Sequence, residues 1–257
     1  MVSVRGRALK TKTTGISFAL AWTALIVAAV CGAVELIAGP GYRMTWWPFG
    51  TGIMMIRWAA TVALGAAVVG LIAALVAAYA GARRNARTGL AALILSLVVA
   101  APPIVMWNRV QQLPRIHDIT TDTDNPPAYV AVLPLRKDAR NPVQYEASTA
   151  TQQKRGYPDL APVVLPLPPA QAFARAEAAA RAMGWEIVTA SPQELRIEAT
   201  DTSLLFGFKD DVVIRVAALA DVSSPSSRID VRSLSRVGGS DFGVNAKRIR
   251  AYLAKLA

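Results

Sequence analysis

Three long apolar runs dominate the first 110 residues of the chain. They lie at 16–38, 54–80 and 89–107, and polar residues are almost confined to the stretches between them. Each run has about the 20 residues that an α-helix needs to cross the hydrocarbon layer of a bilayer. The first run is too long for a removed signal peptide and lacks a small-residue cleavage site. We therefore predict a membrane anchor of three transmembrane helices over residues 1–110.

Beyond residue 168 the pattern changes to shorter elements. Residues 169–183 and 244–256 place apolar side chains on one helical face, which predicts two amphipathic helices. The segments between them alternate or are rich in β-branched residues, which is typical of strands. Five strands are predicted, at 185–190, 194–200, 204–208, 212–219 and 228–237. This order predicts an antiparallel meander sheet with helices on one face, an α+β domain over 169–257.

Two turns of the predicted sheet are indicated by polar residues. Lys209, Asp210 and Asp211 separate the third and fourth predicted strands, and the serine-rich segment 222–227 separates the fourth and fifth. Acidic residues and serine are common turn formers. We therefore expect Asp210 and Asp211 in a hairpin turn.

Residues 111–168 join the predicted anchor to the predicted domain and contain most of the 16 prolines. Proline removes a backbone donor and restricts the residue before it, so we expect no regular helix here. The segment 129–135 has the composition of a strand, and Pro134 favours a place at a sheet edge. We predict an extended, proline-rich connector that wraps over the domain or follows the membrane surface.

The charge pattern predicts how the helices are oriented. The formal net charge is +11, and almost all of the excess lies in residues 1–110. Cations gather before the first run and at 83–87, whereas the loop between the first two runs holds only Arg43. The positive-inside rule then predicts a cytoplasmic N-terminus and places everything after Trp107 outside. In a bacterium this is a multi-pass protein of the inner membrane with a periplasmic C-terminal domain.

The same pattern weighs against two classes of function. Because the positive charge lies in the membrane half, it does not indicate nucleic-acid binding. A transport pathway leaves charges or broken helices inside the spans, but Glu35 and Arg57 lie near span ends. Small residues along the second run suit close helix packing within the chain or against a partner. Cys31, the single cysteine, is expected to be a packing residue.

His117, the only histidine, stands beside Asp118 in RIHDITTDTDNPP. A zinc site would need further histidine or cysteine ligands outside the membrane, and the sequence has none. The spacing of a calcium loop fails as well, because Pro126 stands where a ligand should be. We expect a structural turn, with no metal and no cofactor, and keep His117 and Asp118 as secondary candidates for a site.

The densest candidate site begins on the last predicted strand. Alternation puts Arg228, Arg232 and Arg236 on one strand face. Guanidinium groups there suit bidentate contacts with an anionic headgroup or with a partner's carboxylates. The structural alternative, which the pattern favours, is pairing with acids on neighbouring strands, such as Glu194 and Glu198.

A glycine loop, Gly238, Gly239 and Ser240, follows this strand and precedes the last predicted helix, which carries Lys247. Amides at a helix N-terminus bind anions, so the loop is a candidate anion or lipid site. Its spacing fits neither a nucleotide phosphate loop nor a nucleophile elbow. Ser240 or Asp241 as the helix cap explains the loop without a ligand. We predict no catalytic residue.

Three blocks of the C-terminal half carry a family resemblance. They are IHDITTDTDNPP, IEATDTSLLFGFKDDVVIRV and RIDVRSLSRVGGSDFGVNAKRIRAYL. Over roughly 116–256 they resemble the bacterial and chloroplast domain-of-unknown-function family numbered fourteen ninety-nine. The three-helix anchor is similar to that of its proteobacterial membrane members. The resemblance implies no activity, cofactor or catalytic residue.

We predict a non-enzymatic envelope protein whose periplasmic domain binds a partner protein or an anionic or lipidic ligand close to the bilayer. A first alternative is a hydrolase or lyase that uses acids such as Asp118, Asp201, Asp210 or Asp211. Such chemistry needs environments that push the pKa values of two acids apart. A second alternative is an accessory subunit of a larger membrane complex, suggested by the small residues of the second run.

Overall fold

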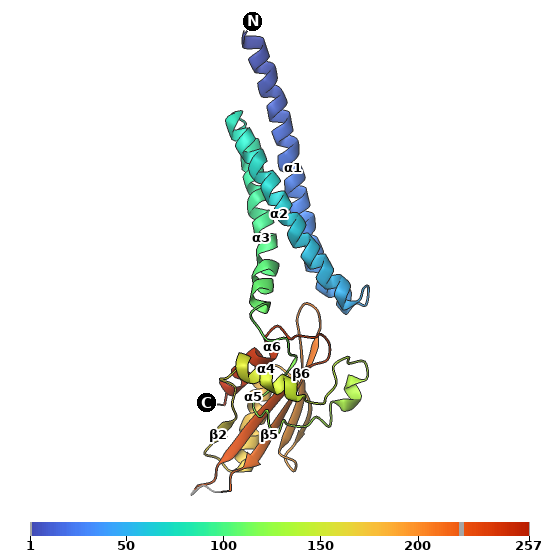
Figure 1. Ribbon diagram of the computed structural model, residues 1–257, viewed down its shortest axis with the longest axis vertical. Helices are drawn as coiled ribbons and strands as arrows, with labels where there is room; N and C mark the ends of the chain where they lie inside the picture. Colours follow the sequence, from blue (N-terminus) through green and yellow to red (C-terminus); the bar gives the residue numbers. More distant parts are fainter. Residues whose placement is uncertain (1, 221–223, 257) are drawn as a thin grey trace. The chain divides into compact units, whose positions relative to one another are not determined.

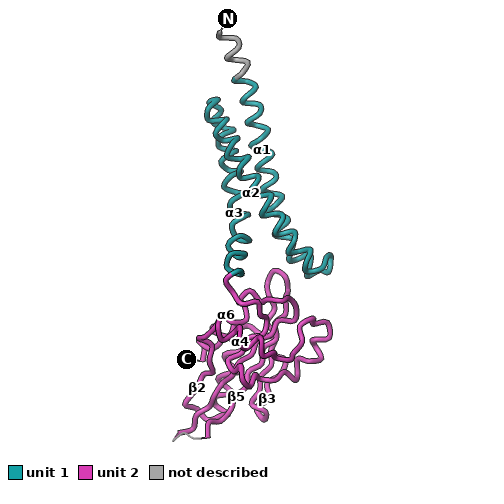
Figure 2. The backbone as a smooth tube through the Cα atoms, in the orientation of Figure 1, with its two compact units in different colours: residues 1–111 teal, residues 112–257 magenta. Residues whose placement is uncertain are grey.

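The computed structural model describes residues 2–220 and 224–256, and for residues 2–9 it describes the helical backbone alone. The chain forms two compact units, unit 1 over Met1–Gln111 and unit 2 over Gln112–Ala257 (Figure 2). Unit 1 holds three long apolar helices, and unit 2 holds an antiparallel sheet with helices (Figure 1). The predicted fold class is confirmed.

Unit 1 consists of α1 (Val2–Arg43), α2 (Phe49–Tyr79) and α3 (Arg83–Val110). Each of these helices contains a stretch long and apolar enough to cross a membrane. They are longer than the predicted spans because residues flanking each apolar run continue the helix.

Alanine and glycine make the closest contacts within unit 1. The buried residues of α2 are all alanine or glycine. A Cβ atom added to Gly89 of α3 would lie 2.7 Å from the nitrogen of Ala74 and from the oxygen of Gly70. Small residues allow such backbone approach between membrane helices. Cys31 is buried in a cluster with Ala59 and neighbouring small residues, as expected for a packing residue.

Unit 2 is built on a six-stranded antiparallel sheet. Its strand order is β1-β6-β5-β4-β3, and β2 also pairs with β6. The strands are β1 (Asp118–Thr120), β2 (Val163–Leu165), β3 (Glu186–Ser191), β4 (Arg196–Thr202), β5 (Lys209–Ala218) and β6 (Ser227–Ser235). The helices are η1 (Leu133–Arg136), α4 (Ala147–Gly156), α5 (Pro169–Ala182) and α6 (Val244–Leu253).

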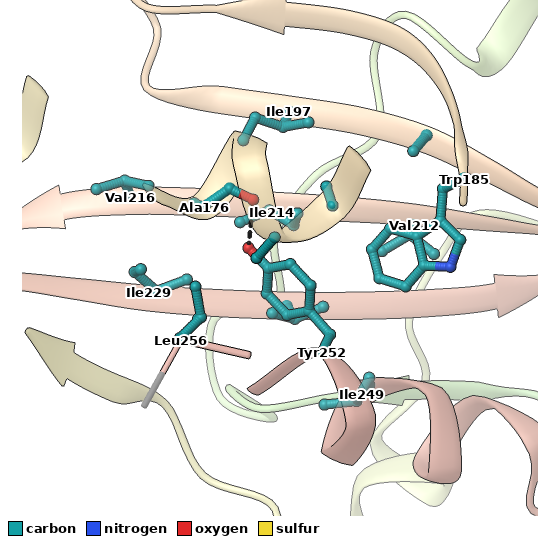
Figure 3. Packing of buried hydrophobic residues seen from close by; sticks show 14 of the residues in the cluster. Ala176, Trp185, Ile197, Val212, Ile214, Val216, Ile229, Ile249, Tyr252 and Leu256 are labelled. Atoms are coloured by element: carbon teal, nitrogen blue, oxygen red, sulfur yellow. Dashed lines mark hydrogen bonds between the residues drawn. The ribbon is translucent and has the colours of Figure 1, made fainter. Parts of the chain in front are cut away.

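Helices α5 and α6 pack on one face of the sheet and close the main core. Apolar residues of the central strands, such as Ile197, Ile214 and Ile229, are fully buried beneath them (Figure 3). The rings of Trp185 and Tyr252 stack with centroids 5.4 Å apart. The Tyr252 hydroxyl donates a hydrogen bond to a carbonyl of α5 (Figure 3). This core joins the apolar positions that alternate along the strands with those on one face of each helix.

The hairpin between β4 and β5 differs from the prediction. The predicted strand at 204–208 is wrong, because Ser203–Phe208 is the hairpin loop and β5 already begins at Lys209. The Asp210–Asp211 pair lies within the strand, where arginines satisfy both carboxylates. The predicted serine-rich turn at 222–227 lies partly outside the described residues, and its last residue begins β6.

The connector, residues 111–168, supplies the strands β1 and β2, and its middle part lies over the other face of the sheet. Tyr129 and Val132 pack there against Val213 and Leu234. The predicted strand at 129–135 is absent, because the backbone amides there bind a side-chain carboxylate of β4 instead of a strand partner.

The connector also contains a regular helix, which the sequence did not predict. Helix α4 forms in the proline-free stretch between Pro142 and Pro158. Gln153 of α4 is buried, and its side chain bonds both the amide and the carbonyl of Thr120 in β1. This side chain fastens α4 to the edge of the sheet.

Candidate functional site

The face of the sheet under the connector is lined with paired charges. Arg232 of β6 is 4% exposed and binds both carboxylate oxygens of Asp118 in β1, at 3.0 and 2.7 Å. Its guanidinium also donates to two carbonyls of the connector. The rings of Tyr129 and Tyr145 flank it, with centroids 4.9 and 5.4 Å from the guanidinium carbon. Arg232 therefore links a core strand, an edge strand and the connector.

A second cluster lies near the end of β6. Arg236 binds both oxygens of Asp211, at 2.9 and 2.7 Å, and donates to the carbonyl of Leu135 in the connector. Arg136 of η1 binds the same carboxylate from the connector side. Asp211 is fully buried and also accepts a hydrogen bond from the hydroxyl of Thr200. Two guanidinium groups thus share one buried carboxylate.

The third predicted arginine belongs to a more open group near the start of β6. Arg228 and Arg215 both bind Asp230 and both bind Asp122 of the connector, with distances from 2.7 to 3.0 Å. Hydrogen bonding to Asp230 raises the pKa of the Arg228 guanidinium. The side chain of Arg228 remains 35% exposed, the most of the three arginines.

Glu198 of β4 anchors the connector in a different way. Its carboxylate is fully buried and accepts hydrogen bonds from the backbone amides of Val130, Ala131 and Val132 at 2.9–3.1 Å. Arg196 lies beside it, 3.1 Å from one oxygen. A buried polar group is stable only when its hydrogen bonds are satisfied. The sheet therefore supplies the carboxylate, and the connector supplies the amides that satisfy it.

These contacts decide what the arginine face does. The alternation of β6 is as predicted, and the arginines pair with acids of the chain. The partners are Asp118, Asp122, Asp211 and Asp230, whereas Glu194 and Glu198 instead lie against Arg196. Sequence reasoning missed three of these acids because they belong to the connector and to β5.

The acids of the alternative hydrolase or lyase hypothesis are also bound to arginine. Asp201 and Asp210 converge on Arg248 of α6, at 2.8 and 2.6 Å, on the helix-covered face. Asp211 points to the opposite face, so the Asp210–Asp211 pair does not converge. Each carboxylate is fixed by charge-assisted hydrogen bonds. This arrangement fastens α6 to the sheet.

The glycine loop leads into α6 through Asp241. Its carboxylate accepts hydrogen bonds from the amides of Gly243 and Asn245, at 2.9 and 2.8 Å. Burial raises the pKa of Asp241 to about 6. Gly238 has a φ of +95°, and its carbonyl accepts a hydrogen bond from Asn141 of the connector. The loop is therefore tied to both neighbours. The N-cap residue of α6 is Gly243, with a φ of +77°, so the prediction of Ser240 or Asp241 as the cap is wrong. Asp241 lies two residues before the cap and binds the amides of Gly243 and Asn245 from there.

His117 contributes through its backbone. Its carbonyl accepts hydrogen bonds from the amide of Ser235 and from the side chain of Asn245, both at 3.0 Å. Across the described residues, 2–220 and 224–256, no group of three His, Cys, Asp or Glu side chains is placed to hold a metal ion.

Exposed residues gather at the end of the sheet where the chain enters unit 2, which we call the entry end. Leu204 and Leu205 in the β4–β5 loop are 86% and 60% exposed. Lys209 and Lys247 are exposed at the same end. Sequence reasoning missed the two leucines because it assigned them to a strand, although LLF directly before glycine shows no alternation.

Unit 1 has a surface feature of its own. An apolar groove of about 420 Å³ lies between α1 and α2, with Val34, Met54 and Trp58 in its wall. Cys31 also reaches it. In a bilayer, acyl chains would surround this groove.

Fold and site together define a class: a protein with three helices able to cross a membrane, followed by an α+β domain whose charged sheet face is closed by a connector. The model of the family described as protein of unknown function, DUF1499, matches residues 118–256, and the chain belongs to this family. The match starts at β1, so the connector is part of the family domain. No curated protein and no solved structure matches the chain.

Proposed function

We propose that this chain is a membrane-anchored envelope protein whose unit 2 lies in the periplasm and binds an anionic or lipidic ligand at the membrane surface. The length of the linker between the units carries the proposal. Helix α3 ends at Val110, and the carbonyl of Ile116 already accepts a hydrogen bond from the amide of Asp241. The backbone between them spans at most roughly 20 Å. The entry end is therefore tethered within that reach of the membrane.

The residues that meet the ligand in this proposal are only partly those that the sequence suggested. Arg232 and Arg236 are engaged by internal carboxylates, so their role is to hold the connector in place. Of the predicted site residues, Gly239 and Lys247 are exposed, and Lys209 joins them at the entry end. Cations near a bilayer surface attract anionic lipids. These exposed groups form the part of the site that meets the ligand.

Native mass spectrometry of gently extracted full-length protein tests this proposal. We expect the protein to retain an anionic lipid or another bound ligand. Lys247→Gln at the start of α6 should reduce that retention several-fold. Lys255→Gln, at another exposed lysine just beyond the other end of α6, is the matched control. A strictly monomeric species without lipid or partner would contradict the proposal, and so would equal retention by both variants.

A further inference from the structure

The β4–β5 loop, Ser203–Phe208, presents apolar side chains to its surroundings. Leu204 and Leu205 are the two most exposed large apolar side chains in the described part of unit 2, at 86% and 60%. We propose that this loop inserts its tip into the interfacial layer of the bilayer that anchors the chain. The inference rests on the proposed function only for the position of the entry end near the membrane.

The backbone of the loop is closed on itself. The amide of Ser203 donates to the carbonyl of Phe208 at 2.8 Å, and the amide of Gly207 donates to the carbonyl of Ser203 at 2.9 Å. The hydroxyl of Ser203 accepts from the amide of Phe208 at 2.9 Å. The rings of Phe206 and Phe208 stack with centroids 5.0 Å apart. These bonds pair backbone groups at the base of the loop, and each polar group paired within the protein lowers the cost of approaching an apolar layer.

The loop lies at the end of unit 2 that the linker reaches. Thr202 pairs with Lys209 at the base of the loop, and the carbonyl of Lys209 accepts a hydrogen bond from Arg236. One residue earlier in β6, the amide of Ser235 donates to the carbonyl of His117, where the chain enters the sheet. Neighbouring strands are about 4.8 Å apart. The loop is thus only a few strand spacings from the tethered chain.

The surroundings of the loop match the chemistry of a lipid interface. Phe242 and Val244, before and within the first turn of α6, are 37% and 44% exposed. Lys209 and Lys247 are exposed at the same end of unit 2. Apolar side chains flanked by cations are the composition of surfaces that bind the headgroup layer. The bilayer is the occupant that satisfies both kinds of side chain.

Electron paramagnetic resonance of spin-labelled full-length protein in vesicles tests the insertion. The label is placed by Leu204→Cys, and Gln193→Cys in the β3–β4 turn at the opposite end of the sheet is the control. Native Cys31 is buried but borders the apolar groove of unit 1, so both labelled variants are made in a Cys31→Ala background. In phosphatidylcholine vesicles with or without phosphatidylglycerol, we expect the ratio of oxygen to nickel-chelate accessibility at position 204 to exceed that at 193 several-fold.

Equal accessibility at the two positions in both kinds of vesicle would overturn the inference. The outcomes also separate it from the proposed function. A label in water at position 204, together with ligand retention that depends on Lys247, would remove the loop proposal alone. A label in lipid without any retained ligand would keep the loop proposal and remove the ligand-binding function.

Discussion

Arg232 shows at the scale of one residue how unit 2 holds its connector. A buried guanidinium loses hydration, and this cost is offset only when carboxylates, carbonyls and rings surround it. Arg232 has Asp118, two connector carbonyls and two tyrosine rings around it. The side chain therefore stabilises the fold through several elements at once.

Replacing Arg232 should consequently destabilise unit 2 strongly. Arg232→Met leaves the Asp118 carboxylate buried without its partner, which typically costs about 3–5 kcal/mol. Lys154→Met removes an exposed ion pair with Asp124, which water screens, and should leave the unfolding midpoint nearly unchanged. Denaturant unfolding of the full-length protein, followed by near-ultraviolet circular dichroism, measures both. Equal midpoints for the two variants would contradict this role.

The raised pKa of Asp241 predicts that the stability of unit 2 depends on pH. Burial raises its pKa to about 6 in the folded protein, above the unfolded value of about 3.9. The folded state therefore binds the proton of Asp241 more tightly than the unfolded chain does. The stability that this difference contributes is complete below about pH 3.9 and is lost as the pH rises through about 6. Asp241→Asn should remove that loss, which is of order 3 kcal/mol.

The measurement is the free energy of unfolding of the wild type minus that of Asp241→Asn between pH 4 and pH 7. This difference should fall as the pH rises. Asp138→Asn, at an exposed connector position, controls for the loss of one carboxylate. A difference that stays flat or rises with pH would contradict this prediction, because Asp241 would then ionise at least as easily in the folded state as in the unfolded chain.

At the scale of elements, the sequence predicted what local patterns encode. The alternation of β6 and the apolar face of α6 were visible because each element buries one side. The partners of the charged residues were not visible, because they are distant in sequence: Arg232 and Asp118 are 114 residues apart. The Asp210–Asp211 pair was wrongly predicted as a turn for the same reason. The arginines that bind the two acids come from η1, from α6 and from the residue directly after β6.

The contact between β4 and the connector gives an element-scale prediction. Glu198→Gln replaces a carboxylate that accepts three amide hydrogen bonds by a group with one acceptor oxygen. The amides of residues 130–132 should then exchange with deuterium several-fold faster, while the core strands β5 and β6 keep their protection. Glu194→Gln, at a half-exposed acid on the same side of Arg196, is the control. Unchanged exchange at 130–132 would contradict the role of Glu198.

At the scale of the whole molecule, the chain combines an apolar three-helix unit with a domain whose two faces are both covered. The main core lies under α5 and α6, and the charged face lies under the connector. The residues exposed for outside contacts include those of the entry end, where Leu204 is the most exposed large apolar side chain of the described part of unit 2 and Lys247 is exposed as well. The sequence therefore predicted a site at the arginines, which the connector covers, and did not predict one at the exposed loop.

The side of the membrane on which unit 2 lies is the central claim, and reporter fusions test it most directly. Alkaline phosphatase fused after Ala257 is active only when it is exported. A reporter restricted to the cytoplasm gives the complementary readout at the same position. The account predicts an active phosphatase and a silent cytoplasmic reporter, and the reverse pair of results would contradict it.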